Sequence, residues 1–248
     1  MTAAAESRET IHIRGAPPHL SAVLPLRRPV SGPVSASVDL PKKVAEMAPL
    51  SARVSLLGHA GLTHLHLKLP RNTPPGAYQG AVEIEDQRKL LIVEVEPRAR
   101  IRVIPKRATI QSQAGKTADL KITLINMGNV ALEVPKTSSF CIYQQRGVDL
   151  AIGRTFQAEL DKNERRIDRL MEELREGYGG VVKLKIKMGA GKLEPGDARD
   201  LDIVLQLPAQ VVAGCSYWGS WPLFGYNFKI DIEITPENKK SPEKSKES

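Results

Sequence analysis

The sequence predicts an all-β protein made of two tandem β-sandwiches, the second carrying one inserted amphipathic α-helix. Three observations lead to this prediction. Short segments of alternating apolar and polar residues recur along most of the 248 residues. Proline, glycine or asparagine separates nearly all of them, as turns between short strands require. One strand–turn–strand pattern occurs twice, which indicates a duplicated domain.

The alternating segments are typical of strands that bury one face. In residues 62–70, Leu65 and Leu67 fall on one face of an extended chain, whereas His64 and His66 fall on the other. Many short strands with frequent turns point to sandwiches or barrels. Further segments of this kind are residues 81–85, 89–96, 101–105, 108–112, 118–126, 181–188, 201–208 and 228–234.

Residues 157–177 break the strand pattern. Their apolar residues are spaced as on one face of a helix, charged residues surround them, and Gly177 ends the segment. This spacing predicts a single amphipathic helix of about five turns. We expect its apolar stripe to pack on the edge or end of the second sandwich; a partner helix is the alternative use. The stripe consists of Leu160, Ile167, Leu170, Met171 and Leu174.

An internal repeat supports two domains rather than one large barrel. Residues 63–84 and 201–234 each read as an alternating strand, Leu-Pro, a spacer, Gly, Tyr, Gly and another alternating strand. We therefore predict one sandwich over 8–98 and a second over 99–236, with the helical insertion at 157–177. Residues 237–248 are polar, mixed in charge and poor in apolar groups, which predicts a disordered charged tail.

Several of these motifs resemble the immunoglobulin-like domains of bacterial and archaeal surface and cell-envelope proteins. The matching segments are Gly115 to Asn129, Pro195 to Asp197, Leu201 to Pro208, and Pro75 to Tyr78. The resemblance covers most of the second domain and the later half of the first. It implies immunoglobulin-like sandwiches and a periplasmic or cell-surface location. The second copy departs from the pattern, because Ala213 to Tyr217 replace the usual Pro-Gly-x-Tyr and a helix is inserted.

The amino-terminal residues bear on the same question of location. The start lacks the basic and then apolar pattern of an export signal, and no later run is apolar and long enough to span a bilayer. A cytoplasmic chain that starts at Met1 and a mature segment whose signal was replaced by Met1 are both consistent with this.

Charge and cysteine content exclude several classes of protein. Thirty-six Lys and Arg against 28 Asp and Glu give a net charge of +8, but the basic residues are scattered and form no compact basic face with interleaved aromatic residues. Nucleic acid is therefore not an expected partner. Two cysteines, Cys141 and Cys215, cannot build a zinc ribbon. One disulfide and two separate thiols both remain open.

Residues 214–228 hold six of the eleven aromatic side chains. Trp218, Trp221 and Phe224 are the candidate contacts for a protein or glycan partner, because aromatic faces stack on sugars and anchor protein interfaces. The alternative is that the cluster seals the core, since Phe228 continues a strand pattern. Tyr78 and Tyr217 precede returning strands, and we expect their hydroxyls to tie nearby loops to the backbone.

All five histidines lie in the first predicted domain. His64 and His66 project from one face of a strand and, with His59 folding back, are candidate ligands for copper or zinc. No nucleophile elbow, phosphate loop or dinucleotide fingerprint is present, so we expect no enzyme and no cofactor. The sequence thus favours a non-enzymatic binding or structural module that works through loops at a sandwich end or a sheet edge, with a metal-binding periplasmic protein as the alternative.

Overall fold

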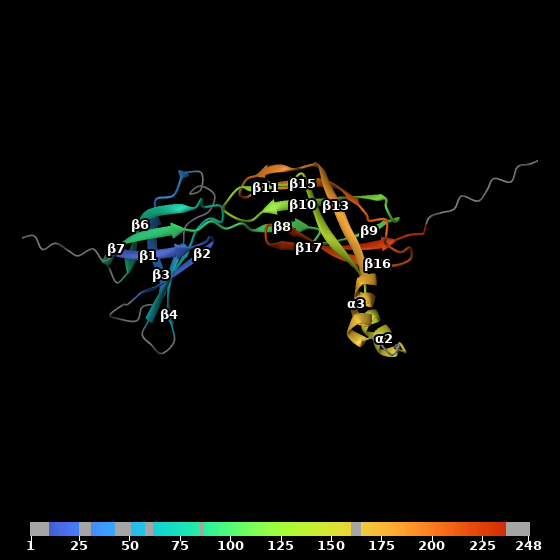
Figure 1. Ribbon diagram of the computed structural model, residues 1–248. Coiled ribbons are helices and arrows are strands. Elements are labelled where there is room, and N and C mark those ends of the chain that lie inside the picture. Colours follow the sequence, from blue (N-terminus) through green and yellow to red (C-terminus); the bar gives the residue numbers. More distant parts are fainter. Residues whose placement is uncertain are drawn as a thin grey trace, which may run out of the picture. The chain divides into compact units, whose positions relative to one another are not determined.

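The computed structural model describes residues 10–24, 31–42, 51–57, 62–84, 87–159 and 165–236. It contains two β-sandwiches and two short helices, which confirms the predicted all-β fold class (Figure 1). The chain divides into two compact units. Unit 1 comprises residues 1–102, 125–132 and 192–198, and unit 2 comprises residues 103–124, 133–191 and 199–248.

The first sandwich has seven strands in the order β1-β7-β6-β3-β4-β5-β2. Strand β3 pairs with β4 through residues 32–34 and with β6 through residues 35–38, so it joins the two layers. Strands β1 and β7 are parallel. The strands are β1 Thr10–Gly15, β2 His19–Leu24, β3 Gly32–Val38, β4 Ser51–Leu57, β5 Leu62–Lys68, β6 Gly76–Ile84 and β7 Gln87–Val95.

The core of the first sandwich follows from the alternation that the sequence displays. Leu65, Leu67 and Leu69 are buried, as the spacing of the segment predicts. They pack with alternating aliphatic residues of β1, β6 and β7, including Ile13 and Leu91.

The second sandwich has eight strands in the order β8-β10-β15-β13-β12-β16-β17-β9. Strand β13 pairs with β12 through residues 178–185 and with β15 through residues 183–188, so it crosses between the layers (Figure 1). Strands β11 Leu132–Val134 and β14 Gly191–Leu193 form a separate pair. The sandwich strands are β8 Ile101–Ile104, β9 Arg107–Ser112, β10 Thr117–Asn126, β12 Thr137–Gln144, β13 Tyr178–Met188, β15 Ala198–Gln206, β16 Ser216–Leu223 and β17 Tyr226–Ile234.

The two sandwiches share one strand order, which explains the repeat in the sequence. From β9 onward the second sandwich runs β9-β17-β16-β12-β13-β15-β10, and this matches β1-β7-β6-β3-β4-β5-β2 position by position. Strand β8 is the additional member. The repeated segments at 63–84 and 201–234 begin on the equivalent strands β5 and β15. In the first sandwich β3, β6 and β7 are neighbours in one layer, and their equivalents β12, β16 and β17 are neighbours in the second. Immunoglobulin-like domains place their third, sixth and seventh strands in one layer in the same way.

Aromatic side chains contribute to the core of the second sandwich, including Phe140 and Tyr217. Trp221 and Phe228 are both 0% exposed and lie opposite each other on β16 and β17. The indole Nε1 of Trp221 donates a hydrogen bond to Ser138 Oγ at 3.1 Å, which satisfies its polar atom. Ile142, Leu184, Leu201 and other aliphatic residues of β10, β12, β13 and β15 complete this core.

Asn129 fixes a loop within unit 1. Its carboxamide Nδ2 donates to the carbonyls of Thr73 at 3.0 Å and Glu96 at 2.9 Å, and its Oδ1 accepts from the Arg98 N–H at 2.6 Å. The side chain is buried and its polar atoms are paired. Residues 125–132 therefore belong with residues 1–102 in one compact unit.

A helical hairpin is inserted between β12 and β13, where the sequence predicts one long helix. Helix α2 spans Gly147–Gln157 and helix α3 spans Arg166–Glu176. The single five-turn helix is wrong, because Ala158 at the end of α2 adopts an extended conformation. Leu160 lies outside the described residues. The predicted helix end at Gly177 is confirmed.

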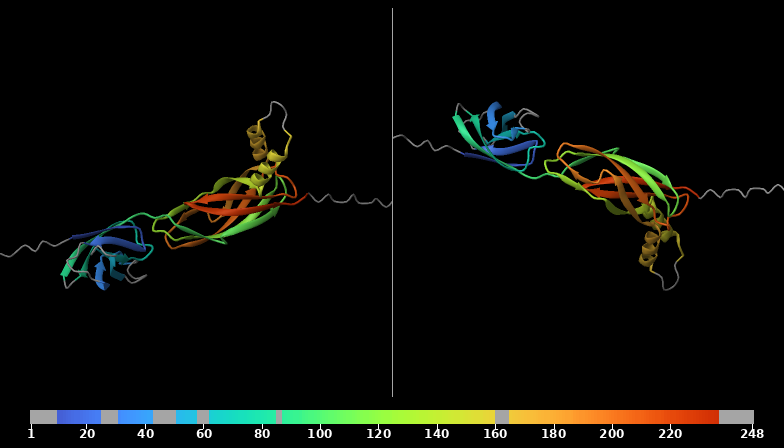
Figure 2. Two further views of the ribbon diagram at one scale, coloured as in Figure 1. Left: turned by 90° about the horizontal axis from the view of Figure 1, so that it is seen from below. Right: turned by 90° about the horizontal axis from the view of Figure 1, so that it is seen from above.

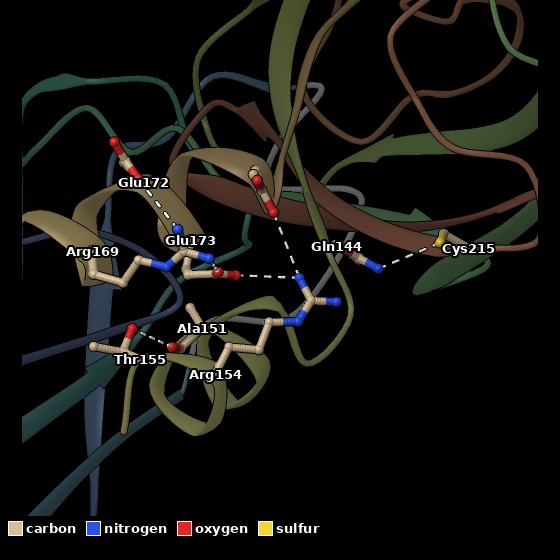
Figure 3. Close-up of polar contacts among 9 residues, drawn as sticks. Gln144, Ala151, Arg154, Thr155, Arg169, Glu172, Glu173 and Cys215 are labelled. Carbon is tan, nitrogen blue, oxygen red and sulfur yellow. Dashed lines mark hydrogen bonds and ion pairs between the residues drawn. The ribbon is translucent and has the colours of Figure 1, made fainter. Parts of the chain in front are cut away.

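The hairpin extends away from its own sandwich instead of lying on it (Figures 1 and 2). An ion pair joins α2 to α3: the buried carboxylate of Glu173 on α3 lies 3.2 Å from Nη1 of Arg154 on α2 (Figure 3). Within α3 the same carboxylate lies 2.9 Å from Arg169 Nη2. Ala151 and Thr155 of α2 are also buried. At the base, Gly147 and Gly177 lie close together, and the Gln144 N–H donates to the Gly177 carbonyl at 2.9 Å.

Candidate functional site

Three aromatic side chains meet on the outer face of the second sandwich, and we call them the aromatic face. Trp218 on β16 and Tyr143 on β12 are each 45% exposed, and their ring centroids are 5.9 Å apart. Tyr178, the first residue of β13, has its ring centroid 5.7 Å from that of Tyr143. Exposed aromatic groups in contact with one another form an anchor surface of the kind found at binding sites.

Strand pairing explains why these residues meet. Tyr143 is the direct partner of Trp218 on one side and of Tyr178 on the other. Cross-strand partners point to the same face of a sheet, with Cβ atoms about 4.5–5.5 Å apart. A bulge between Ile142 and Tyr143 shifts the register with β13 at this point. The bulge brings Tyr178 opposite Tyr143, and bulges commonly redirect side chains in this way.

Tyr178 also contacts a thiol. Its hydroxyl lies 3.7 Å from Cys141 Sγ. This hydrogen bond, with smaller contributions from burial and from the neighbouring Cys141 and Tyr143, raises the pKa of the Tyr178 phenol. The phenol is therefore neutral at physiological pH and keeps its proton available for donation.

A polar cavity of about 260 Å³ adjoins the Trp218 side of the aromatic face. The buried carboxylate of Asp231 accepts a short hydrogen bond from Arg107 and lies 3.5 Å from Gln145 Nε2. The hydrogen bond to Asp231, together with the attraction between the charges, raises the pKa of the Arg107 guanidinium. The cavity is lined by Arg107, Gln145, Trp218, Gly219, Lys229 and Asp231.

The two positive groups and the buried carboxylate have different roles in this cavity. Asp231 is the cross-strand partner of both Trp218 and Thr109, so it sits in the middle of the sheet and its charge is balanced by Arg107. Lys229 follows the same outward alternation along β17 and lies on the cavity wall. The site thus offers an aromatic surface beside paired charges, which suits recognition of a polar ligand by stacking and hydrogen bonding.

The structure does not bring the three predicted aromatic contacts together. Trp218 is exposed, but Trp221 is 0% exposed and faces the core, because three positions along a strand lead to the opposite face. Trp221 is therefore a core residue in this structure and has no surface for a partner. The alternative reading of the cluster, that part of it seals the core, applies to Trp221 and Phe228.

Phe224 occupies the tight turn between β16 and β17. Phe224 and Gly225 have φ values of 45° and 79°, the left-handed pair that a two-residue hairpin turn requires. The Phe224 side chain is half-buried. Six residues separate it from Trp218, roughly 20 Å along a strand, so it lies apart from the aromatic face.

The two predicted tyrosine ties are present. The Tyr78 hydroxyl donates to the Pro74 carbonyl at 2.8 Å, and burial raises the pKa of this phenol. The Tyr217 hydroxyl accepts a hydrogen bond from the Val212 N–H at 3.0 Å. Each phenol fixes the loop that precedes its own strand, so both tyrosines are structural.

The histidine pair does not form a metal site with the residues that the structure describes. His64 and His66 lie on one face of β5 with ring centroids 5.8 Å apart, but Nε2 of His66 is 2.8 Å from Ser55 Oγ and Arg53 is the strand partner of His66. No group of three His, Cys, Asp or Glu side chains is arranged to hold a metal ion within the described ranges. His59 lies outside the described residues.

The two cysteines are free thiols. Cys141 lies on the outer face next to Tyr178, whereas Cys215 accepts a hydrogen bond from Gln144 Nε2 at 3.4 Å (Figure 3). Neither of the two described helices is long and apolar enough to cross a membrane.

Sequence reasoning missed Tyr143 and Tyr178 as members of the site. Each lies far from residues 214–228 in the chain, and only the register of β12 against β13 and β16 brings them together. Arg107 and Asp231 were missed for the same reason. They are far apart in the sequence, and the parallel pairing of β9 with β17 brings these two segments together. No local pattern in the sequence signals these pairings.

Comparisons with known proteins give no family for the chain. No protein-family model matches it, and no curated protein matches it. Among solved structures, similarity is found to a protein of unknown function from Porphyromonas gingivalis W83, with 12% identity over 90% of this chain and 96% of that one and a TM-score of 0.28. The adhesin InvE of Yersinia pseudotuberculosis has 13% identity over 91% of this chain and 56% of that one, with a TM-score of 0.26.

A three-domain titin fragment has 10% identity over 91% of this chain and 62% of that one, with a TM-score of 0.30. Scores of this size do not establish a common architecture along the whole chain. The immunoglobulin-like assignment therefore rests on the strand order of the two sandwiches, which is the same in both and places the equivalent strands as such domains do.

Proposed function

We propose that the chain is a non-enzymatic binding module that takes a protein partner on the aromatic face of its second sandwich. The observation that carries this proposal is the exposed indole of Trp218 in contact with Tyr143 on an outer sheet face. Trp and Tyr are enriched among the residues that dominate binding energy at protein interfaces, because they bury a large area with few rotatable bonds.

The polar cavity supports the same proposal. Arg107 and Lys229 supply hydrogen-bond donors in the cavity that Trp218 also lines, and Arg107 is already oriented by Asp231. An oriented guanidinium loses little freedom when it binds a carboxylate or carbonyl of a partner. An apolar anchor beside preorganised polar groups is the usual composition of an interface centre.

The partner can be tested by site-specific photo-crosslinking in the native cells. A photoreactive phenylalanine analogue at position 218 is expected to give one discrete adduct, because this position lies at the centre of the proposed surface. The matched control places the analogue at Lys183, which is exposed on β13 and belongs to the same outer face. The proposal fails if position 218 gives no adduct or if both positions give the same adducts.

A glycan is the competing ligand for the same surface, since aromatic rings also stack on sugars. Binding of soluble oligosaccharides that disappears in Trp218→Ala, with no protein adduct at position 218, would replace the protein partner by a glycan. The module is proposed to work in the periplasm or at the cell surface, on the basis of its immunoglobulin-like motifs. Cell fractionation followed by protease treatment of intact cells tests this location.

A further inference from the structure

The helical hairpin carries an apolar face that nothing in the described structure covers. Five apolar side chains of the hairpin are 44–66% exposed: Val148, Ile152 and Phe156 on α2, and Ile167 and Met171 on α3. They are spaced four residues apart on each helix, which places them in one stripe per helix. The residues that hold α2 to α3 are different ones, namely Ala151, Thr155 and Glu173.

The two stripes lie on the same side of the hairpin. In α2 the stripe residues Ile152 and Phe156 follow the inward-facing Ala151 and Thr155 by one position, about 100° farther round the helix. In α3 a rotation round the helix in the same sense leads from the inward-facing Glu173 first to Leu174 and then to the stripe residues Ile167 and Met171.

The helices are antiparallel, because Gly147 meets Gly177 at one end and Arg166 lies 5.6 Å over the Phe156 ring at the other. Equal rotations in antiparallel helices lead to one common side. We call this side the hairpin face.

We propose that the hairpin face binds the hairpin face of a second copy of this chain and forms an antiparallel four-helix bundle with two-fold symmetry. In such a pairing, each helix meets its own copy running in the opposite direction. A residue on one side of the two-fold axis therefore contacts the residue that lies equally far on the other side in the second copy. On α2 the stripe is centred on Ile152, so the small Val148 meets the large Phe156 of the second copy. The same axis passes α3 beside Met171.

Ile152 and Met171 lie at the same level of the hairpin, so a single two-fold axis passes beside both. The base joins Gly147 to Gly177, and Ile152 and Met171 lie five and six residues from it. At about 1.5 Å per residue, the two side chains stand at nearly equal heights. One axis perpendicular to the helices therefore brings α2 onto its copy and α3 onto its copy at once.

The charges beside the stripe favour a second copy over an unrelated partner. Asp168 and Arg175 are seven residues apart on α3, at the edge of the hairpin face farthest from α2, and both are exposed. Neither forms an ion pair with another described residue, whereas Arg154 and Arg169 both pair with Glu173. Their midpoint falls next to Met171, so the same axis brings Asp168 of each copy to Arg175 of the other.

The exposed area predicts a weak assembly. The five side chains present on the order of 500 Å², comparable to the largest apolar patch on a typical monomer and below the ~800 Å² per partner of a standard interface. A dissociation constant on the order of 100 µM is therefore expected.

Sedimentation equilibrium of the full chain between about 10 µM and 1 mM tests this proposal over the range in which such a dimer forms. The unmodified chain is expected to dimerise, and Met171→Glu is expected to weaken the dimer by at least about tenfold, because it places two carboxylates at the axis. Leu150→Glu is the matched control, since Leu150 is exposed on the opposite side of α2. Circular dichroism at 222 nm verifies that each variant keeps its helices.

Charge exchange distinguishes the two-fold arrangement from any other. Asp168→Arg and Arg175→Asp are each expected to weaken the dimer, and the double variant is expected to restore it, since the two reciprocal pairs are rebuilt with reversed signs. A chain that stays monomeric at 1 mM overturns the proposal. So does a dimer that Met171→Glu leaves unchanged, or a double exchange that does not restore it.

Discussion

Trp218 and Trp221 are three residues apart and have opposite roles, because a strand turns alternate side chains to opposite faces. Trp218 lies on the outer face with Tyr143, whereas Trp221 is packed in the core with its Nε1 bonded to Ser138. Their closeness in the sequence therefore does not indicate a shared function. The strand itself separates them.

Substitution of each tryptophan by alanine is expected to show this difference. Trp221→Ala should lower the free energy of unfolding by about 3–5 kcal/mol, as removal of a core aromatic does. Trp218→Ala should change it by less than about 1 kcal/mol, as an exposed side chain does. Urea unfolding measures both, and acrylamide should quench the fluorescence of Trp218 but hardly that of Trp221. Equal destabilisation by the two changes would contradict the structure.

Phe224 is strained by its position in the turn. Its φ of 45° disfavours a residue with a Cβ, and the next residue, Gly225, also has a positive φ. Phe224→Asn creates the Asn-Gly pair that such turns prefer and is expected to raise the free energy of unfolding by about 0.5–1 kcal/mol. Phe224→Val, a β-branched control, should lower it. Thermal unfolding of the two variants decides, and a stability order opposite to this one is inconsistent with a left-handed turn.

At the scale of the element, the hairpin depends on one buried carboxylate. Glu173 accepts hydrogen bonds from Arg154 and Arg169, and its removal leaves two guanidinium groups without their shared partner (Figure 3). Both guanidiniums keep contact with water, which limits the loss to roughly 1–2 kcal/mol. Glu173→Ala should therefore lower the melting temperature of the helical signal at 222 nm by several degrees. Glu172→Ala removes only an exposed ion pair with Arg169 at 3.7 Å and should lower that temperature much less, and equal shifts would argue against a central role of Glu173.

Removal of the whole hairpin tests its independence from the sandwich. Because Gly147 and Gly177 lie close together, residues 148–176 can be replaced by a two-residue glycine linker without stretching β12 or β13. The shortened chain is expected to lose its helical signal and to keep its β signal and its cooperative unfolding. Collapse of the β signal would show that the insertion supports the sheets.

Most strands from β5 onward and helix α3 were predictable from sequence, whereas helix α2 was not, for a physical reason. Strands such as 62–70 bury one face, so alternation records their environment directly. Helix α2 contains Val148, Ile152 and Thr155, β-branched residues that are poor helix formers, and it has no regular polar face. Leu150 lies on the side of α2 opposite the stripe, so the apolar residues do not gather on one face and the amphipathic pattern is weak.

The candidate site shows the same limit. Alternation predicts which residues of a strand share a face, but it does not predict the neighbouring strand. Trp218 could be selected from its segment alone, whereas Tyr143, Tyr178 and Arg107 join it only through cross-strand register. Register is a property of the assembled sheet.

At the scale of the whole molecule, the two sandwiches repeat one strand order, and the loop around Asn129 belongs to unit 1. The predicted boundary at residues 98–99 cuts this unit, because Asn129 bonds to Arg98 and Glu96. A fragment of residues 99–236 is expected to keep cooperative unfolding from its own core, but to lose protection at the Asn129 amide, because its acceptor Arg98 is absent from the fragment. Hydrogen exchange compared with the full chain measures this. Unchanged protection at the Asn129 amide would mean that residues 125–132 hold their conformation alone.

The parallel pairing of the edge strands β1 and β9 with the last strand of each sandwich has a mechanical consequence. In each sandwich an early strand, β1 or β9, lies parallel to the last strand, β7 or β17, over six residue pairs. When a chain is pulled by its two ends, neighbouring parallel strands slide lengthwise past each other, and their backbone bonds share the load instead of breaking one after another. In each sandwich the six residue pairs of this parallel contact would therefore have to shear together before the two strands part.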